Sequence, residues 1–116
     1  MIGRSLAAIC FCLAVAGPVA GTEQAETGIA SVYSYGGTKS ASGERTDPRG
    51  MTAAHRTLPF GTMVTVTNKK NGRQVTVRIN DRGPFIPGRI IDLTPAAASE
   101  LGFSGLAPVR MTVSAN

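Results

Sequence analysis

The stretch TMVTVTNKKNGRQVTVRIN, residues Thr62–Asn80, is typical of a β-hairpin. Apolar and polar side chains alternate over residues 62–68 and again over residues 74–80, which is the period of a strand with one buried face. Between them lies Asn71-Gly72, a dipeptide that strongly favours a tight turn between antiparallel strands. The apolar side chains predicted to face the core are Val64, Val66, Val75, Val77 and Ile79.

Shorter strand patterns lie on both sides of this hairpin, at residues 28–35, 88–93 and 108–113. Residues 38–50 are rich in Ser, Gly, Asp and Pro, which predicts a long loop. We also place residues 52–55 in a loop. The sequence therefore predicts short strands joined by turns and loops, with no internal repeat and no linker.

One short helix is expected near the C-terminal end of this pattern. Thr94 is suited to be its N-cap, Pro95 to be its first residue, and Gly102 to end it after Leu101. Five or six short strands with one helix favour a small closed β-barrel, because a sandwich of this size would leave strand edges exposed. The predicted fold class is mainly β.

Composition narrows the classes of protein that the chain can belong to. The chain has 116 residues, enough for one domain, of which 42% are hydrophobic and 16% charged, so it is too apolar to be disordered. Its 14 Gly and 7 Pro are too many for a helical bundle. The net charge of +5 favours anionic partners in general. Nucleic acid is not expected, because only 5% of residues are aromatic and no basic run exceeds Lys69-Lys70.

Residues 1–21 are predicted to be a signal peptide for export. Arg4 provides the positive charge, residues 6–16 are apolar, and Gly17-Pro18 ends the apolar run before small residues suited to cleavage. This run is shorter than the stretch of about 20 residues that spans a bilayer. No stable membrane insertion is therefore expected after the signal is removed.

The two cysteines, Cys10 and Cys12, lie inside this predicted signal, so no disulfide is expected in the mature chain. Neither cysteine follows a small residue as a lipid-modified cysteine would. We therefore expect a soluble exported protein of the periplasm or cell envelope. Residues 22–27 are polar and are predicted to be a flexible leader, followed by the folded domain at residues 28–113.

Asp81 is the most informative acidic residue. It shares the apolar face of its predicted strand and ends that strand just before Gly83-Pro84. Partial burial there would favour the protonated form, which suits a general acid, whereas Arg78 and Arg82 would favour the ionised form. The residues alone leave two roles open, a general acid and a side chain that caps the turn.

Three other residues also have two interpretations each. Asp92 lies in an apolar run and belongs either to a structural hydrogen-bond network or to a site with a second carboxylate. His55, the one histidine, is either structural or functional, and Tyr33 is either a core residue or a platform for a sugar ring. No metal site or cofactor is predicted, because clustered ligands, a nucleophile motif and a phosphate-binding loop are all missing from the sequence.

A series of short motifs follows in order along the chain: Gly28–Tyr33, Ala41–Glu44, Thr52–His55, Leu58–Thr62, Val66–Asn68, Asn71–Arg73, Asn80–Phe85, Gly88–Leu93 and the helix at Ala96–Ala98. Single motifs are weak signals, but the ordered set is specific. Taken together they resemble the rare lipoprotein A (RlpA) family, over nearly all of residues 28–113.

The resemblance implies a six-stranded double-psi β-barrel, a fold shared with expansins. It also implies a lytic transglycosylase that cleaves the peptidoglycan bond between N-acetylmuramic acid and N-acetylglucosamine, in some members with a preference for strands stripped of stem peptides. The family's acid is the Asp of the N-D-R-G-P motif, here Asp81, and its helper is the His of T-A-A-H, here His55. The residues expected to bind glycan are Tyr33, Thr52, Asn80, Arg82 and Asp92.

One catalytic carboxyl group suffices for this reaction. A typical glycoside hydrolase needs two, whereas in a lytic transglycosylase the muramic 6-hydroxyl of the substrate attacks C1 and forms a 1,6-anhydro ring. Asp81 would first donate a proton to the glycosidic oxygen and then accept the proton of the 6-hydroxyl.

Three functions stay open at this point. They are the enzyme, a non-catalytic glycan-binding or wall-loosening module of the expansin kind, and an envelope protein that binds another protein. Peptidoglycan glycan strands are the expected partner of the first two, and a monomer without cofactor is expected. The resemblance adds envelope proteins of cell division as candidate partners.

Overall fold

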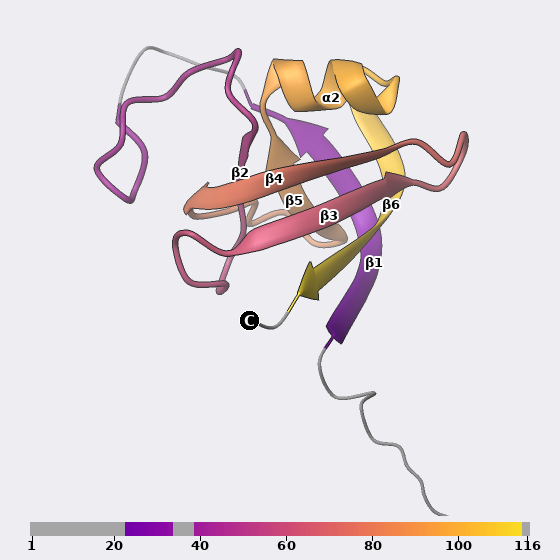
Figure 1. Cartoon of the computed structure of the whole chain (residues 1–116), viewed down its shortest axis with the longest axis horizontal. Helices are drawn as coiled ribbons and strands as arrows, with labels where there is room; N and C mark the ends of the chain where they lie inside the picture. The colour runs from indigo at the N-terminus through magenta and orange to yellow at the C-terminus, as the bar shows by residue number, and fades with distance from the viewer. Residues whose placement is uncertain (1–22, 34–38, 115–116) are drawn as a thin grey trace, which may run out of the picture.

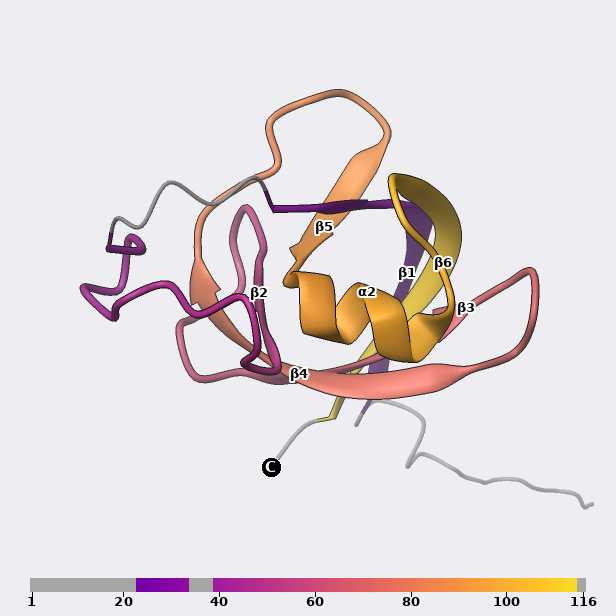
Figure 2. The same ribbon diagram turned by 90° about the horizontal axis from the view of Figure 1, so that it is seen from above.

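The computed structural model describes residues 23–33 and 39–114, and its strands form a closed six-stranded β-barrel (Figure 1). The strands are β1 (Glu23–Val32), β2 (Thr52–Ala54), β3 (Met63–Asn68), β4 (Gln74–Asp81), β5 (Arg89–Leu93) and β6 (Leu106–Ser114). The helix α2 (Pro95–Leu101) lies across one end of the barrel (Figure 2). The predicted barrel with one short helix is thus confirmed. The signal peptide predicted at residues 1–21 lies outside the described residues.

The order of strands around the ring is β1-β5-β2-β4-β3-β6, and β6 then pairs with β1. Two neighbouring pairs, β1–β5 and β2–β4, are parallel, and the other four are antiparallel. Each strand of the barrel has a neighbour on both sides. The ring therefore avoids the exposed strand edges that a sandwich of this size would have. Within the described residues, no helix is long and apolar enough to cross a membrane.

The alternating valines of β3 and β4 fill the barrel as predicted. Val64, Val66, Val77 and Ile79 are completely buried, whereas Val75, nearer the turn, is only partly buried. Each such side chain contributes roughly 1.5–3 kcal/mol when it is removed from water. Other large, fully buried side chains of the core are Ile91, Leu93, Leu101, Val109 and Met111.

The turn of the predicted hairpin is also connected to the helix. Gly72 has a φ of 78°, in the left-handed region that glycine adopts without strain. The side-chain amides of Asn68 and Asn71 donate to the main-chain oxygen of Leu101, at 2.9 and 3.0 Å. These bonds satisfy a carbonyl at the end of α2 that has no partner inside the helix.

Residues 23–27, predicted as part of a flexible leader, instead form the first half of β1. This half pairs with β6 from Glu23 opposite Ser114 onwards. The segment EQAET shows no hydrophobic alternation, so the sequence pattern could not reveal it as a strand. Main-chain hydrogen bonds to β6, rather than a buried apolar face, determine its conformation.

Residues 52–54, predicted as a loop, form β2. All three residues are buried, and the strand lies between β4, to which it is parallel, and β5, to which it is antiparallel. Thr52, Ala53 and Ala54 are small, and a run of three gives no period to recognise. The neighbours of β2, which are distant in sequence, make it a strand.

Both predicted ends of α2 are confirmed. The Thr94 hydroxyl accepts a hydrogen bond from the main-chain N–H of Ala97 at 3.1 Å, and Gly102 is left-handed with a φ of 81°. The same hydroxyl donates to the carbonyl of Gly50 at 2.7 Å, and the Thr94 side chain is completely buried. Thr94 therefore fixes the end of the 39–50 loop as well as the start of α2.

We predict that Thr94→Ala lowers the free energy of unfolding by about 2 kcal/mol, because it removes the helix cap and leaves the Gly50 carbonyl without its partner. Urea denaturation of the folded domain measures the change. Thr94→Ser, which keeps the hydroxyl, should lose less than half as much, and Ser99→Ala on the exposed face of α2 serves as the matched control. Equal stability of Thr94→Ala and the wild type would contradict this role.

Candidate active site

Asp81 ends β4, and its half-buried carboxylate joins three segments of the chain. The Tyr33 hydroxyl, directly after β1, donates to Oδ2 at 2.9 Å. The main-chain N–H groups of Ala41, in the 39–50 loop, and of Arg82 donate to Oδ1 at 2.8 and 2.9 Å. The bond from Arg82 resembles the predicted turn cap, but the other two connect Asp81 to distant parts of the chain.

The loop that supplies Ala41 is attached to β4 through Glu44. The guanidinium of Arg78 donates to both carboxylate oxygens of Glu44, at 3.0 and 2.7 Å, and the amide of Asn80 donates to Oε1 at 3.2 Å. Hydrogen bonds from Arg78 and then Asn80 lower the pKa of Glu44, whose carboxylate is therefore ionised at neutral pH. Asn80, predicted to bind glycan, is buried, and its side-chain amide points to the carboxylate of Glu44.

Glu44 and Ala41 were not among the predicted site residues. Their contacts with β4 span more than 30 residues of sequence, and nothing local marks them. The one available signal was the Ala41–Glu44 motif within an otherwise irregular loop.

Asp92, on β5, is half-buried and accepts a hydrogen bond from the Ser31 hydroxyl of β1 at 3.0 Å. Partial burial raises the pKa of Asp92. The hydrogen bond from Ser31 and the charge of Arg89 act against this rise, and the charge of Asp81 adds to it. The two aspartates therefore lie close enough to interact, and both interpretations of Asp92, network member and second carboxylate, are compatible with its place.

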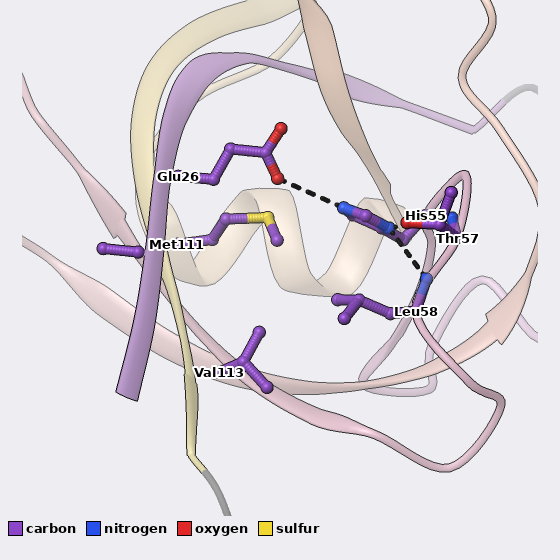
Figure 3. A pocket seen from close by; sticks show the side chains of 7 residues that line it. Glu26, His55, Thr57, Leu58, Met111 and Val113 are labelled. Atoms are coloured by element: carbon purple, nitrogen blue, oxygen red, sulfur yellow. Dashed lines mark hydrogen bonds and ion pairs between the residues drawn. The ribbon is translucent and has the colours of Figure 1, made fainter. Parts of the chain in front are cut away.

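His55 follows β2, and its ring is buried. Its Nδ1 accepts from the main-chain N–H groups of Thr57 and Leu58, both at 3.1 Å, and its Nε2 lies 3.3 Å from Oε1 of Glu26 (Figure 3). Because Nδ1 is an acceptor, the neutral ring has its proton on Nε2. The ring thus fixes the 55–58 turn and contacts β1.

A cavity of ≈ 270 Å³ lies beside this histidine (Figure 3). Its walls come from β1, β6 and the segment after β2, and they combine the His55–Glu26 pair with apolar side chains. The residues that line it are Ala25, Glu26, His55, Thr57, Leu58, Met111 and Val113. Asp81 does not line it, so the cavity and the Asp81 carboxylate occupy different places on the barrel.

The main chain, rather than the ring, connects His55 with Asp81. The N–H of His55 donates to the carbonyl of Asp81 at 3.1 Å. The guanidinium of Arg82 donates to the carbonyls of His55 and Leu58, at 3.1 and 2.8 Å, and lies over the Phe60 ring, 4.1 Å from its centroid. Arg82, predicted to bind glycan, therefore holds the turn that follows β2.

The predicted site residues thus fall into two groups. The first group is Tyr33, Asp81 and Asp92, which lie at or near one carboxylate cluster, with Asn80 adjacent through Glu44. The second group is His55 and Arg82, which hold the turn after β2. Thr52 is buried in the barrel wall, where its carbonyl accepts from the N–H of Thr94 at 3.3 Å. In residues 23–33 and 39–114, no group of three or more His, Cys, Asp or Glu side chains could hold a metal ion.

Asp92→Asn should make the fold less sensitive to rising pH. Because the pKa of Asp92 is raised in the folded chain, the folded state binds this proton more tightly than the unfolded state. Ionisation of Asp92 therefore destabilises the fold as pH rises through the raised pKa. Urea denaturation should show the variant gaining stability relative to wild type as the pH rises above about 4, where the carboxyl group of the unfolded chain ionises. A constant difference would contradict this, with Glu100→Gln as the control.

Known protein sequences similar to this chain belong to one family. Residues 25–111 match the family described as lytic transglycolase. Over 92 residues the chain is 61% identical to the probable endolytic peptidoglycan transglycosylase RlpA of Nostoc sp., covering 74% of this chain and 25% of that protein. Over 90 residues it is 54% identical to the endolytic peptidoglycan transglycosylase RlpA of Campylobacter jejuni, covering 74% and 33%. The chain therefore spans a third or less of these two relatives.

Solved structures of similar shape support the same assignment of the fold. The Streptomyces papain inhibitor superposes with a TM-score of 0.62 at 26% identity, covering 78% of this chain and 94% of that one. The expansin of Clavibacter michiganensis superposes with a TM-score of 0.64 at 23% identity, covering 80% and 52%. The expected double-psi β-barrel is thereby confirmed. With its barrel, its N-D-R-G-P aspartate and its match across most of its length, this chain belongs to the lytic transglycolase family of RlpA-like domains.

Proposed function

We propose that this chain is an endolytic peptidoglycan lytic transglycosylase in which Asp81 is the catalytic acid. The observation that carries the proposal is the Asp81 carboxylate, which three donors from separate segments hold in one orientation. Family membership and the activity for which the relatives are named support the substrate and the reaction.

The proposed reaction conserves the proton and uses no water. Asp81 donates its proton to the oxygen between N-acetylmuramic acid and N-acetylglucosamine, and the bond from this oxygen to C1 breaks. The muramic 6-hydroxyl oxygen then attacks C1, and its proton passes to the Asp81 carboxylate. The products are a 1,6-anhydro end and a free 4-hydroxyl, and the enzyme regains its acid form.

Glycan strands are the proposed partner, and their place in the cell wall puts the protein in the cell envelope. The net charge of +5 is compatible with attraction to the anionic wall. An expansin of the same fold has been solved in complex with cellohexaose, which supports glycan as the class of ligand that this barrel binds. Export through the signal predicted at residues 1–21, and a monomeric state, belong to the same proposal.

We assign His55 a positioning role, in contrast to a direct part in proton transfer. Its ring satisfies the N–H groups of Thr57 and Leu58, and the turn so formed supplies the carbonyls that hold Arg82. The main-chain N–H of Arg82 in turn bonds the Asp81 carboxylate. Loss of the His55 ring would therefore disturb the position of the Asp81 carboxylate through the main chain of this turn and Arg82.

The change Asp81→Asn should abolish the reaction while leaving the fold intact. The amide oxygen still accepts from Ala41 and Arg82, but the group cannot supply a proton, so we expect a loss of at least about a hundredfold. The domain is incubated with intact and with amidase-stripped peptidoglycan, and anhydro-muramic ends are counted by mass spectrometry. Glu100→Gln on α2 is the matched carboxylate control. Activity retained in Asp81→Asn would refute this role, and glycan binding without anhydro ends in the wild type would favour the non-catalytic module.

Two substitutions separate a positioning from a chemical role of His55. In His55→Asn the side-chain oxygen can replace Nδ1 as the acceptor for Thr57 and Leu58, whereas His55→Ala leaves both N–H groups without a partner, at a cost of about 1–3 kcal/mol. We expect His55→Asn to keep most of the anhydro-product rate and His55→Ala to lose most of it. Equal inactivity of the two variants, with native circular dichroism, would show that the imidazole itself takes part in the chemistry.

A further inference from the structure

We infer that Tyr33 is a positioning residue that makes Oδ2 of Asp81 the oxygen that holds the catalytic proton; the inference rests on the proposed function. The two carboxylate oxygens of Asp81 have different kinds of partner. Oδ1 accepts two main-chain N–H groups, from Ala41 and Arg82, and Oδ2 accepts the hydroxyl of Tyr33. This difference determines which oxygen can be protonated without leaving a fixed main-chain donor unpaired.

Oδ1 is unsuited to hold the proton. A main-chain N–H can only donate, so a proton on Oδ1 would face two other donors and displace at least one of them. Ala41 lies in the loop that Glu44 attaches to Arg78 and Asn80, and Arg82 N–H belongs to the turn next to Asp81 itself. Both donors are thus held in place, and protonation at Oδ1 would leave a polar group without its partner.

Oδ2 has a partner that can adapt. A hydroxyl rotates about its C–O bond and can either donate to a carboxylate or turn away from a carboxylic acid. When Oδ2 is protonated, its proton points to the glycosidic oxygen and the Tyr33 hydroxyl need not donate. When the proton has left and the glycosidic bond has broken, the hydroxyl, which lies 2.9 Å from Oδ2, donates to the new carboxylate. The 6-hydroxyl proton then returns to Oδ2.

The barrel itself holds Tyr33 in this position. The main-chain N–H of Tyr33 donates to the carbonyl of Leu93 at 2.8 Å, which continues the pairing of β1 with β5. Its hydroxyl reaches Asp81 on β4, across the ends of β5 and β2 in the ring. Because the phenol ring is rigid and its main-chain N–H is bonded to β5, the hydroxyl is held within hydrogen-bond distance of Oδ2.

Other charged groups surround Asp81 but do not replace this partner. On β5, the charge of Asp81 raises the pKa of Asp92, and the charge of Arg89 lowers it. The ring of His55 faces Glu26, the carboxylate of Glu44 faces Arg78, and the guanidinium of Arg82 faces main-chain carbonyls. A variant that changes only the Tyr33 hydroxyl therefore leaves every one of these groups in place.

The test compares wild type, Tyr33→Phe and Tyr35→Phe, which changes the other tyrosine of the chain, using the full mature chain and amidase-stripped glycan. For Tyr33→Phe we expect kcat to fall about tenfold with KM changed less than about twofold, because the bond to the carboxylate forms only as the proton leaves. Loss of this donor makes the ionised form of Asp81 less favourable relative to the protonated form. The acid is therefore retained to higher pH, and the alkaline limb of the pH–rate profile moves to higher pH. Tyr35→Phe should match the wild type.

A second variant strengthens the hydrogen bond from position 33 and should shift the pH–rate profile in the opposite direction. Incorporation of 3-fluorotyrosine at position 33 preserves the shape of the ring and makes the hydroxyl a stronger donor, so the alkaline limb should move to lower pH. Opposite shifts for the two variants support the inference, and the fluorinated protein provides a result even if Tyr33→Phe does not fold. A raised KM with unchanged kcat and pH profile would overturn it and make Tyr33 a sugar contact. Absence of anhydro ends with wild type would instead refute the proposed function.

Discussion

Closure of the barrel through β1 is the constraint on which the rest of the structure depends. This strand pairs with β6 over nearly its whole length and with β5 over its second half, and without it both neighbours would become edges. Closure also brings the site together. Following the ring from β1 through β5 and β2 to β4, Tyr33 comes directly after β1, Asp92 lies on β5, His55 follows β2 and Asp81 ends β4. Hydrogen-bonded pairs of the site are thereby formed between residues 48 and 61 positions apart in sequence, Tyr33 with Asp81 and Ser31 with Asp92.

The site uses two kinds of hydrogen bond for two purposes. Main-chain N–H groups and carbonyls hold Asp81 and Arg82 in fixed positions, because they cannot change their role as donor or acceptor. Hydroxyl groups, which can rotate, contact the carboxylates of the two aspartates: Tyr33 contacts Asp81 and Ser31 contacts Asp92. This combination of fixed main-chain donors and a rotatable hydroxyl is compatible with the proposed role of Asp81 as an acid that gives up and regains a proton.

Local signals explain which parts of this molecule could be predicted from sequence. The β3–β4 hairpin has alternating valines and Asn71-Gly72, and α2 has its cap and stop residues, so both were predicted close to their observed bounds. The first half of β1 and all of β2 lack such signals, because one is polar and the other is three small residues whose conformation depends on distant strands. The site shows the same division. Asp81 became a candidate through its place at the end of a strand, and the family resemblance implied its role as acid, whereas the contacts of Ala41, Glu44 and Glu26 exist only in the folded chain.

The pairing of Glu23 with Ser114 has a further consequence for how this domain can be used. It places the first and last described residues of the barrel side by side, at the same end of the molecule (Figure 1). A unit of this kind can be inserted into a surface loop of a host protein through one narrow attachment, with little strain on either side. The same proximity makes the barrel a suitable scaffold for circular permutation, in which a short peptide joins the two ends and new ends are opened at an exposed turn such as the one at Gly72.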